Sequence, residues 1–241
     1  ARLDFEPDLP LIALCQRASL SELPAERVQL EWLKLLLKGR SLSRGMRVAR
    51  QANILARVFP EAVDDEARDA ILDRLCMSSA AIVPEGRRLA TLLLGWLHAT
   101  AKDGVVQTLD RLWIHRVGSY NVRDRLLEAH RHWNDPIQTD ADLRNLSTHA
   151  DVTVALTARA AICDDPTVEQ SLDRARVLGV ENEPPPPLLL GRHLKRLGIP
   201  SGPWMGVSLK KVYQLQLDGS VTTLEEALVA AKALTELQSD G

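Results

Sequence analysis

A stretch of positively charged residues without neighbouring acids is the strongest chemical signal in this sequence. Residues 184–217 contain no Asp or Glu, although the whole chain of 241 residues has a formal net charge of −2. The stretch carries five cations, at Arg192, Lys195, Arg196, Lys210 and Lys211. Such a cluster attracts phosphate groups whatever the base sequence, so it predicts contact with a nucleic-acid backbone.

Glycines in the same stretch strengthen this prediction. Gly202 and Gly206 flank the predicted start of a helix, beside Pro203 and Trp204. The first turn of a helix has free backbone N–H groups, and its dipole favours a phosphate oxygen. Glycine also allows a partner to approach the backbone closely. The alternative is a structural helix corner with Trp204 packed inside.

A second basic feature lies near the N-terminus. Arg44, Arg47 and Arg50 are spaced three residues apart. This spacing forms a basic stripe on a helix, suited either to phosphates or simply to solvent.

Motifs typical of common enzymes are absent from the sequence: it has no GxxxxGK[ST], GxGxxG, GxSxG or HExxH. Asp140 and Asp142 form a D-x-D pair, which would suit a divalent ion. The pair stands at a predicted helix start, however, where carboxylates complement the helix dipole. We therefore interpret it as structural and predict neither catalytic residues nor a metal site in this chain.

The three cysteines, Cys15, Cys76 and Cys163, are far apart and form no CxxC pair. We interpret them as core residues of a cytoplasmic protein. No apolar run is long enough for a membrane span.

The fold class predicted from the pattern is all-α. Leu, Ala, Arg and Glu dominate, aromatic residues make up only 4%, and alternating strand-like runs are missing. Helices are predicted over residues 23–37, 41–59, 64–77, 84–100, 103–116, 120–133, 139–150, 151–162, 165–179, 203–217 and 222–237. Thr139 is a predicted helix cap, and Thr223 with Glu226 has the spacing of a capping box. Four prolines at residues 184–187 predict a stiff spacer and a hinge-like break before a small helical tail.

Two stretches resemble the bacterial CCA-adding enzyme and poly(A) polymerase family. The first runs from a Gly-x-x-Leu helix through a Gly-Pro-x-x-Gly turn to Gln-Leu-Asp-Gly and an acidic helix with Ala-Leu. It matches at Gly191, Leu194, Leu197, Gly198, Ile199, Gly202, Pro203, Gly206, Gln216, Leu217, Asp218, Gly219, Ala227 and Leu228. The second is "ARLDFEP" with the following helix, where Glu26, Arg27, Glu31, Lys34, Leu35 and Leu36 fall on the neck motif of the family.

The resemblance implies an enzyme with a head, a neck, a body and a tail. The head would hold Mg²⁺ on paired carboxylates together with CTP or ATP, and body and tail would hold tRNA. The sequence starts after the point where the head and the nucleotide-selecting Glu-Asp-x-x-Arg helix would end. We therefore expect a partial neck at residues 1–60, a helical body at residues 61–183 and an RNA-binding tail at residues 184–241.

The expected function is the RNA-binding portion of a class II tRNA nucleotidyltransferase that adds CMP or AMP to the tRNA 3′ end. Its partners would be tRNA and a catalytic head, either in the same protein or in a separate chain. This chain would hold no cofactor and would not catalyse alone. Phosphates would contact Arg192, Lys195, Arg196, Gly202, Gly206, Lys210 and Lys211. Glu26, Arg27 and Glu31 would order the neck helix, and Arg44 and Arg47 would line a cleft.

Two alternatives remain open at this point. One is a fragment of a bacterial poly(A) polymerase acting on mRNA ends; such enzymes end in Arg-rich tails, whereas this sequence ends in an acidic helix. The other is a non-catalytic helical scaffold that binds proteins and has no salt-dependent affinity for RNA.

Overall fold

The computed structural model describes residues 6–20, 23–62, 66, 69–196, 198 and 202–239. Within these residues the regular elements are all helices, which confirms the all-α prediction. The helices are α1 (Leu9–Arg17), α2 (Ala25–Lys38), α3 (Leu42–Gln51), α4 (Ile54–Val58), α5 (Asp69–Ser78), α6 (Glu85–Leu97), α7 (Lys102–Arg111), α8 (Val122–Arg131), α9 (Asp140–His149), α10 (Val152–Cys163), α11 (Pro166–Val177), α12 (Gly191–Arg196), α13 (Pro203–Leu217) and α14 (Leu224–Ser239). None of the described helices is long and apolar enough to span a membrane.

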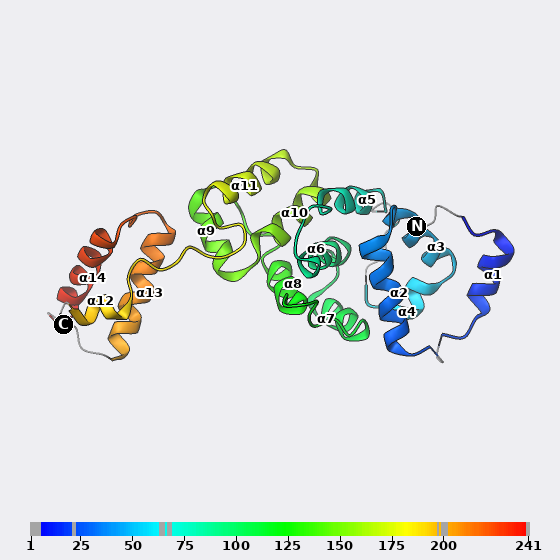
Figure 1. The fold of residues 1–241 in the computed structure, drawn as a ribbon, viewed down its shortest axis with the longest axis horizontal. Coiled ribbons are helices and arrows are strands. Elements are labelled where there is room, and N and C mark those ends of the chain that lie inside the picture. The colour runs from blue at the N-terminus through cyan, green and yellow to red at the C-terminus, as the bar shows by residue number, and fades with distance from the viewer. Residues whose placement is uncertain are drawn as a thin grey trace. The chain divides into compact units, whose positions relative to one another are not determined.

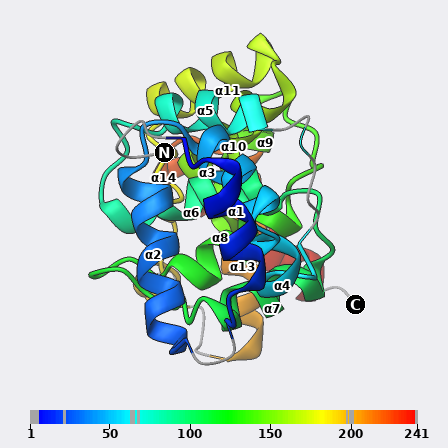
Figure 2. The same cartoon turned by 90° about the vertical axis from the view of Figure 1, so that its right-hand side faces the viewer.

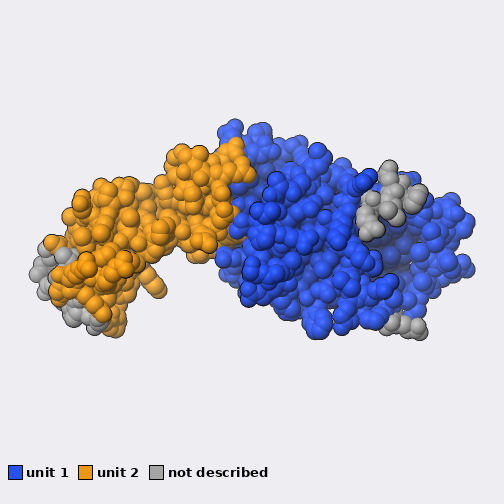
Figure 3. Space-filling view, viewed as in Figure 1, with its two compact units in different colours: residues 1–135, 153–172 blue, residues 136–152, 173–241 orange. Residues whose placement is uncertain are grey.

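The chain divides into two compact units, coloured separately in Figure 3. Unit 1 comprises residues 1–135 and 153–172, and unit 2 comprises residues 136–152 and 173–241. These units are defined by their internal contacts. The boundaries of the neck, body and tail expected from the sequence stay a prediction.

Helix α6 lies at the centre of unit 1 (Figure 1). Ten of its thirteen residues are buried, and it packs against α2, α5 and α8. A helix that is apolar on every side is stable only when other elements surround it. Two glycines allow the close packing, because a Cβ on Gly86 would lie 3.0 Å from the Val117 carbonyl oxygen and one on Gly95 would lie 2.2 Å from a Leu75 methyl.

Three aromatic rings join the N-terminal helices to α6. Trp32 of α2 lies 4.7 Å from Phe59 and 5.2 Å from Trp96 of α6, measured between ring centroids. Phe59 and Trp96 meet edge to face at 5.2 Å. Aromatic contacts of this kind stabilise a core beyond simple area burial. Figure 2 shows α1 to α4 from the side of this N-terminal end of unit 1.

Two predicted helices end earlier than their apolar patterns suggested. The helix predicted over residues 41–59 is broken by Asn53, whose φ is 56°, and becomes α3 and α4. The helix predicted over residues 103–116 ends at Arg111, and Trp113 follows with φ 47°. Both positions are left-handed, a conformation that periodicity does not reveal.

The C-terminal part of unit 2 is a small three-helix arrangement of α12, α13 and α14 (Figure 1). Its core is made by Leu194 of α12, Met205 and Val212 of α13, and Ala227 and Ala231 of α14. The predicted capping box opens α14, since Glu226 N–H donates to Thr223 Oγ1 at 3.2 Å and Thr223 N–H donates to Glu226 Oε2 at 3.2 Å.

The proline segment before this tail is held against α13. The Tyr213 hydroxyl donates to the Pro185 carbonyl at 2.8 Å, and Gln216 Nε2 donates to the Pro186 carbonyl at 2.9 Å. Leu188 N–H in turn donates to Gln216 Oε1 at 2.9 Å. Partial burial raises the pKa of the Tyr213 hydroxyl, so it stays a donor. The stiff spacer predicted here is therefore fastened to the tail along residues 185–188.

We expect Gly86→Ala to destabilise unit 1. The added Cβ would meet Tyr120 Cβ at 2.9 Å and the Val117 carbonyl oxygen at 3.0 Å, and overpacking of this kind costs about 1–3 kcal/mol. Urea unfolding measures the free energy, with Gly206→Ala as the control: no atom lies within 4 Å of its added Cβ, so this variant should not lower the midpoint. An unchanged midpoint for Gly86→Ala would contradict the close packing described here.

Candidate nucleic-acid interface

The predicted phosphate-binding residues of the tail all lie at the surface. Arg192, Lys195 and Arg196 are exposed on α12, and Lys210 and Lys211 are exposed on α13. Gly202 and Gly206 are exposed at the start of α13. The helix pattern explains this placement, because the core of the tail takes the intervening apolar residues Leu194, Met205 and Val212.

The cations of the tail have no acidic partners nearby. In the part of the chain that the structure describes, none of these five side chains forms an ion pair. Arg192 donates from Nε to His193 Nε2 at 3.4 Å, a contact that involves no carboxylate. Among the described side chains, internal pairing therefore does not cancel the positive charge of the tail, and uncancelled positive charge is the electrostatic character of a phosphate-binding surface.

The two tail glycines are not required by the packing of this chain. A Cβ added at Gly202 or Gly206 would meet no atom within 4 Å. Gly202 has φ 176°, an extended conformation open to any residue. Gly206 lies inside α13, where glycine is less favourable than alanine by about 1 kcal/mol. The open space over these positions leaves room for an external partner to approach the backbone.

Trp204 is half-buried at the start of α13. Its ring lies under the Lys211 ammonium, 6.0 Å from the ring centroid. Part of the Gly/Pro turn predicted before α13, residues 199–201, and Leu197 lie outside the described residues. The resemblance at residues 1–5 falls outside them as well.

The predicted neck residues of α2 form surface pairs. Glu26 stands in the first turn of α2, where an acid complements the helix dipole. Arg27 Nε lies 3.7 Å from Glu31 Oε1, one helical turn on, and Lys34 Nζ lies 2.9 Å from the same oxygen. These contacts support the helix locally, each by a small amount because the groups are exposed.

The arginines of α3 are paired, in contrast to the tail cations. Arg44 Nε and Arg47 Nη2 lie 3.7 Å and 3.1 Å from the Glu6 carboxylate. Arg50 makes a two-pronged contact with Asp69, at 2.9 Å and 3.1 Å. The basic stripe predicted from spacing is thus largely neutralised by two acids from other parts of unit 1.

The N-terminal helices also enclose a cavity that we did not predict. It has a volume of about 860 Å³ and is lined mainly by apolar side chains of α2, α3 and α4, including Val28, Trp32 and Val48. Arg27 and Glu31 lie on its wall, whereas Arg44 and Arg47 do not. Trp32 Nε1 is buried without a hydrogen-bond partner among the described residues. The apolar residues that line the cavity come from three separate helices. A periodic pattern within one helix therefore could not predict the cavity.

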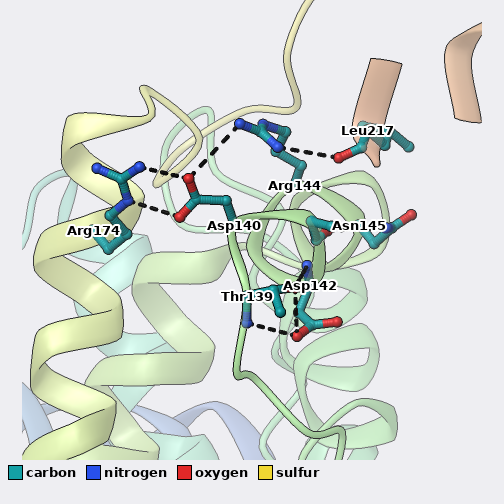
Figure 4. A network of polar contacts seen from close by, with 8 residues as sticks. Thr139, Asp140, Asp142, Arg144, Asn145, Arg174 and Leu217 are labelled. Carbon is teal, nitrogen blue, oxygen red and sulfur yellow. Dashed lines mark hydrogen bonds and ion pairs between the residues drawn. The ribbon is translucent and has the colours of Figure 1, made fainter. Parts of the chain in front are cut away.

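The D-x-D pair is structural, as Figure 4 shows. Arg174 of α11 donates to both oxygens of Asp140, at 2.7 Å and 2.5 Å. Asp142 instead accepts from the backbone of Gln138 and Thr139 and closes the capping box with Thr139 at the start of α9. The predicted cap at Thr139 is therefore confirmed.

The same network joins α9 to α13 within unit 2. Arg144 donates to the Leu217 carbonyl at 3.3 Å, and Gln214 Nε2 donates to Asn145 Oδ1 at 3.1 Å. The hydrogen bond from Arg174 lowers the pKa of the Asp140 carboxyl below its usual range. The backbone N–H of Gln138 does the same for the pKa of Asp142.

Comparison with known proteins gives one match. Residues 11–65 match a family model described as "Probable RNA and SrmB- binding site of polymerase A". The matched segment holds α2, α3 and α4, all of the cavity-lining residues except Arg111, and all five predicted neck residues. It supports an RNA partner and a relation to the poly(A) polymerase and CCA-adding family. No curated protein and no solved structure matches the chain.

The Asp140–Arg174 pair predicts an acid-sensitive unit 2. Because the pKa of Asp140 is lowered on folding, its stabilisation is present above the ordinary value of 3.8 and is lost as the pH falls through the lower value. We expect Asp140→Asn to lower the melting temperature at neutral pH and to flatten its decline in acid. Part of the decline in melting temperature should remain in this variant, because the pKa values of Asp142 and Glu226 are also lowered.

Thermal unfolding followed by circular dichroism across acidic to neutral pH measures this effect. Glu183→Gln, which removes another exposed carboxylate of unit 2, is the matched control. The ion pair would be unimportant if both variants had the same pH profile as the natural protein.

Proposed function

We propose that this chain is the RNA-holding portion of a cytoplasmic tRNA nucleotidyltransferase, the class II type that adds CMP or AMP to tRNA 3′ ends. The tail would bind RNA phosphates through the five cations of α12 and α13, and Gly202 and Gly206 would let the RNA backbone approach closely. The helices of the partial neck, residues 1–60, would lie on the side of the RNA and the incoming nucleotide.

The observation that carries this proposal is the contrast in charge pairing. The arginines of α3 are paired with Glu6 and Asp69, whereas the cations of the tail form no ion pair within the described residues. Unpaired surface cations repel one another and are costly to gather without a ligand. A polyanion relieves that repulsion, and it gains further free energy by releasing its counterions.

The chemical step would take place on a catalytic domain outside this sequence, either elsewhere in the same protein or in a separate chain. Mg²⁺ and CTP or ATP would be held there, and phosphoryl transfer would depend on the positioning of the RNA end. The role of this chain's own residues is to bind the RNA and to fix its orientation.

A second candidate is a portion of a bacterial poly(A) polymerase that binds mRNA ends. The description of the matched family, which names polymerase A, favours it. Competition separates the two: a folded tRNA should displace a labelled tRNA far better than unstructured oligoadenylate does. Equal competition by both RNAs would favour the poly(A) polymerase.

We expect Lys210→Glu with Lys211→Glu to weaken binding to every tRNA about equally. Log K falls linearly with log salt, and each phosphate contact contributes about 0.9 to the steepness of this fall on a duplex. The double variant, which loses two contacts, should therefore show a slope that is shallower by about 1.8. Fluorescence anisotropy with labelled tRNA over a salt series measures both the affinity and the slope.

The control for this variant is Lys102→Glu with Lys232→Glu, which changes the net charge equally at two exposed lysines outside the acid-free stretch. An equal loss in control and variant would mean that net charge alone governs binding. If the natural protein had no salt-dependent affinity for tRNA or oligoadenylate, the RNA-binding proposal would be wrong and a protein-binding scaffold would remain.

Gly206→Ala should separate stability from binding. Alanine is the better helix former by about 1 kcal/mol, and its Cβ has open space, so unfolding of the tail should need more denaturant. The same methyl group would stand between α13 and an approaching phosphate, so tRNA affinity should fall. Urea unfolding and anisotropy on the same sample give both quantities; tighter or unchanged binding would remove Gly206 from the interface.

A further inference from the structure

Trp113 occupies a backbone position that normally requires glycine. It directly follows the C-cap of α7 with φ 47°. Trp113 N–H donates to the Asp110 carbonyl, and Ile114 N–H donates to the Leu109 carbonyl, both at 3.0 Å. These two bonds define the Schellman ending of a helix, in which the left-handed residue is usually Gly and sometimes Asn. For a bulky side chain this conformation is unfavourable.

Two other helices of this chain end in the same way, and both have glycine at that position. Gly179 after α11 has φ 68°, and Gly219 after α13 has φ 80°. Each repeats the pair of backbone hydrogen bonds seen at Trp113. The sequence thus supplies glycine at two equivalent helix ends and an indole at the third.

Burial does not explain the indole. Trp113 is 59% exposed, and no aromatic ring stacks on it among the residues that the structure describes. The apolar contact typical of this helix ending is made instead by its neighbours Leu109 and Ile114, which are 0% and 2% exposed. The backbone at Trp113 is also fixed by a contact that does not involve the ring, because Gln29 Nε2 of α2 donates to the Trp113 backbone carbonyl at 3.2 Å.

The loop that follows Trp113 carries one arginine, Arg116, without an ion pair among the described residues. Residues 111–123 contain three arginines, His115 and no Asp or Glu. Arg111 is paired with Glu61 at 2.9 Å, and Arg123 with Asp110 at 2.6 Å. Arg116 is exposed and donates from Nη2 only to the Ser119 carbonyl, at 2.8 Å. Its charge meets no carboxylate within the described residues, so it remains available for a phosphate.

We propose that Trp113 is a stacking platform for an unpaired RNA base, with Arg116 contacting an adjacent phosphate. This inference rests on the proposed RNA-binding function and adds a second contact region, in unit 1, to the one in the tail. An exposed ring, with an exposed guanidinium three residues further along the chain, is the combination that binds single-stranded nucleic acid without reading its sequence. The unfavourable backbone conformation is retained because it points an apolar ring at solvent, where a base can reach it.

The decisive variant is Trp113→Gly, because glycine keeps the left-handed helix ending and removes only the ring. We expect its melting temperature to equal or exceed that of the natural protein. Its affinity for a labelled single-stranded RNA should fall about tenfold, the typical loss for one stacked base, with the slope of log K against log salt unchanged. Trp113→Phe should retain most of the affinity.

Two further variants make the comparison specific. Arg116→Ala should lower the salt slope by about 0.7, the value for one phosphate of a single strand. Met77→Ala removes another exposed apolar side chain of unit 1, 79% exposed, and should bind RNA normally.

Three results would count against the proposal. If the natural protein binds RNA and Trp113→Gly binds it equally well, the stacking site is wrong while the RNA-binding function stands. A lower melting temperature for Trp113→Gly would mean that the ring serves packing. If the natural protein binds no RNA, the proposed function itself fails.

Discussion

Unit 1 depends on one constraint, which is that α6 has almost no side facing solvent. Such a helix can exist only if α2, α5 and α8 cover it, and its glycines set how closely they approach. Gly86 lets the turn between Val117 and Tyr120 lie directly on the helix. The turn at residues 117–120 is thus held by the core, while Trp113 a few residues earlier remains exposed. The aromatic cluster of Trp32, Phe59 and Trp96 ties the N-terminal helices to the same support.

The tail reaches its stability differently, because its core is small. The buried residues of α12, α13 and α14 are few and include two alanines. Hydrogen bonds from Tyr213 and Gln216 to the proline segment add to this core, and prolines lose little conformational freedom when they are held. Leu194 of α12 and Met205 and Val212 of α13 face inward, whereas the outer surface carries the cations together with Val207, which is 43% exposed. The same amphipathic pattern therefore builds the core and displays the charge.

Helices and helix caps, which depend on residues close together in the sequence, could be predicted. Ion pairs and cavities that join residues distant in the sequence could not. Most of the helices follow from composition and periodicity, although α1 was not predicted, and the Thr139 and Thr223 caps follow from spacing alone. The neutralisation of Arg44 and Arg47 depends on Glu6, and that of Arg50 on Asp69, which no local pattern connects. The cavity beside Trp32 is missed for the same reason. The helix end at Trp113 escaped prediction because its usual signal, a glycine, is replaced by the residue type least expected there.

At Gly206 and at Trp113, the stability of the chain by itself favours a residue other than the one present. Inside α13 an alanine would be favoured and would meet no atom; after α7 a glycine would be favoured, as at Gly179 and Gly219. The side chain at position 206 is smaller than the helix favours, and the side chain at position 113 is larger than the helix ending favours. A general looseness of packing cannot produce both. A bound partner can, because a phosphate backbone needs an empty surface and an unpaired base needs a flat ring. In the two proposals made above, Gly206 leaves room for a phosphate and Trp113 offers its ring to a base.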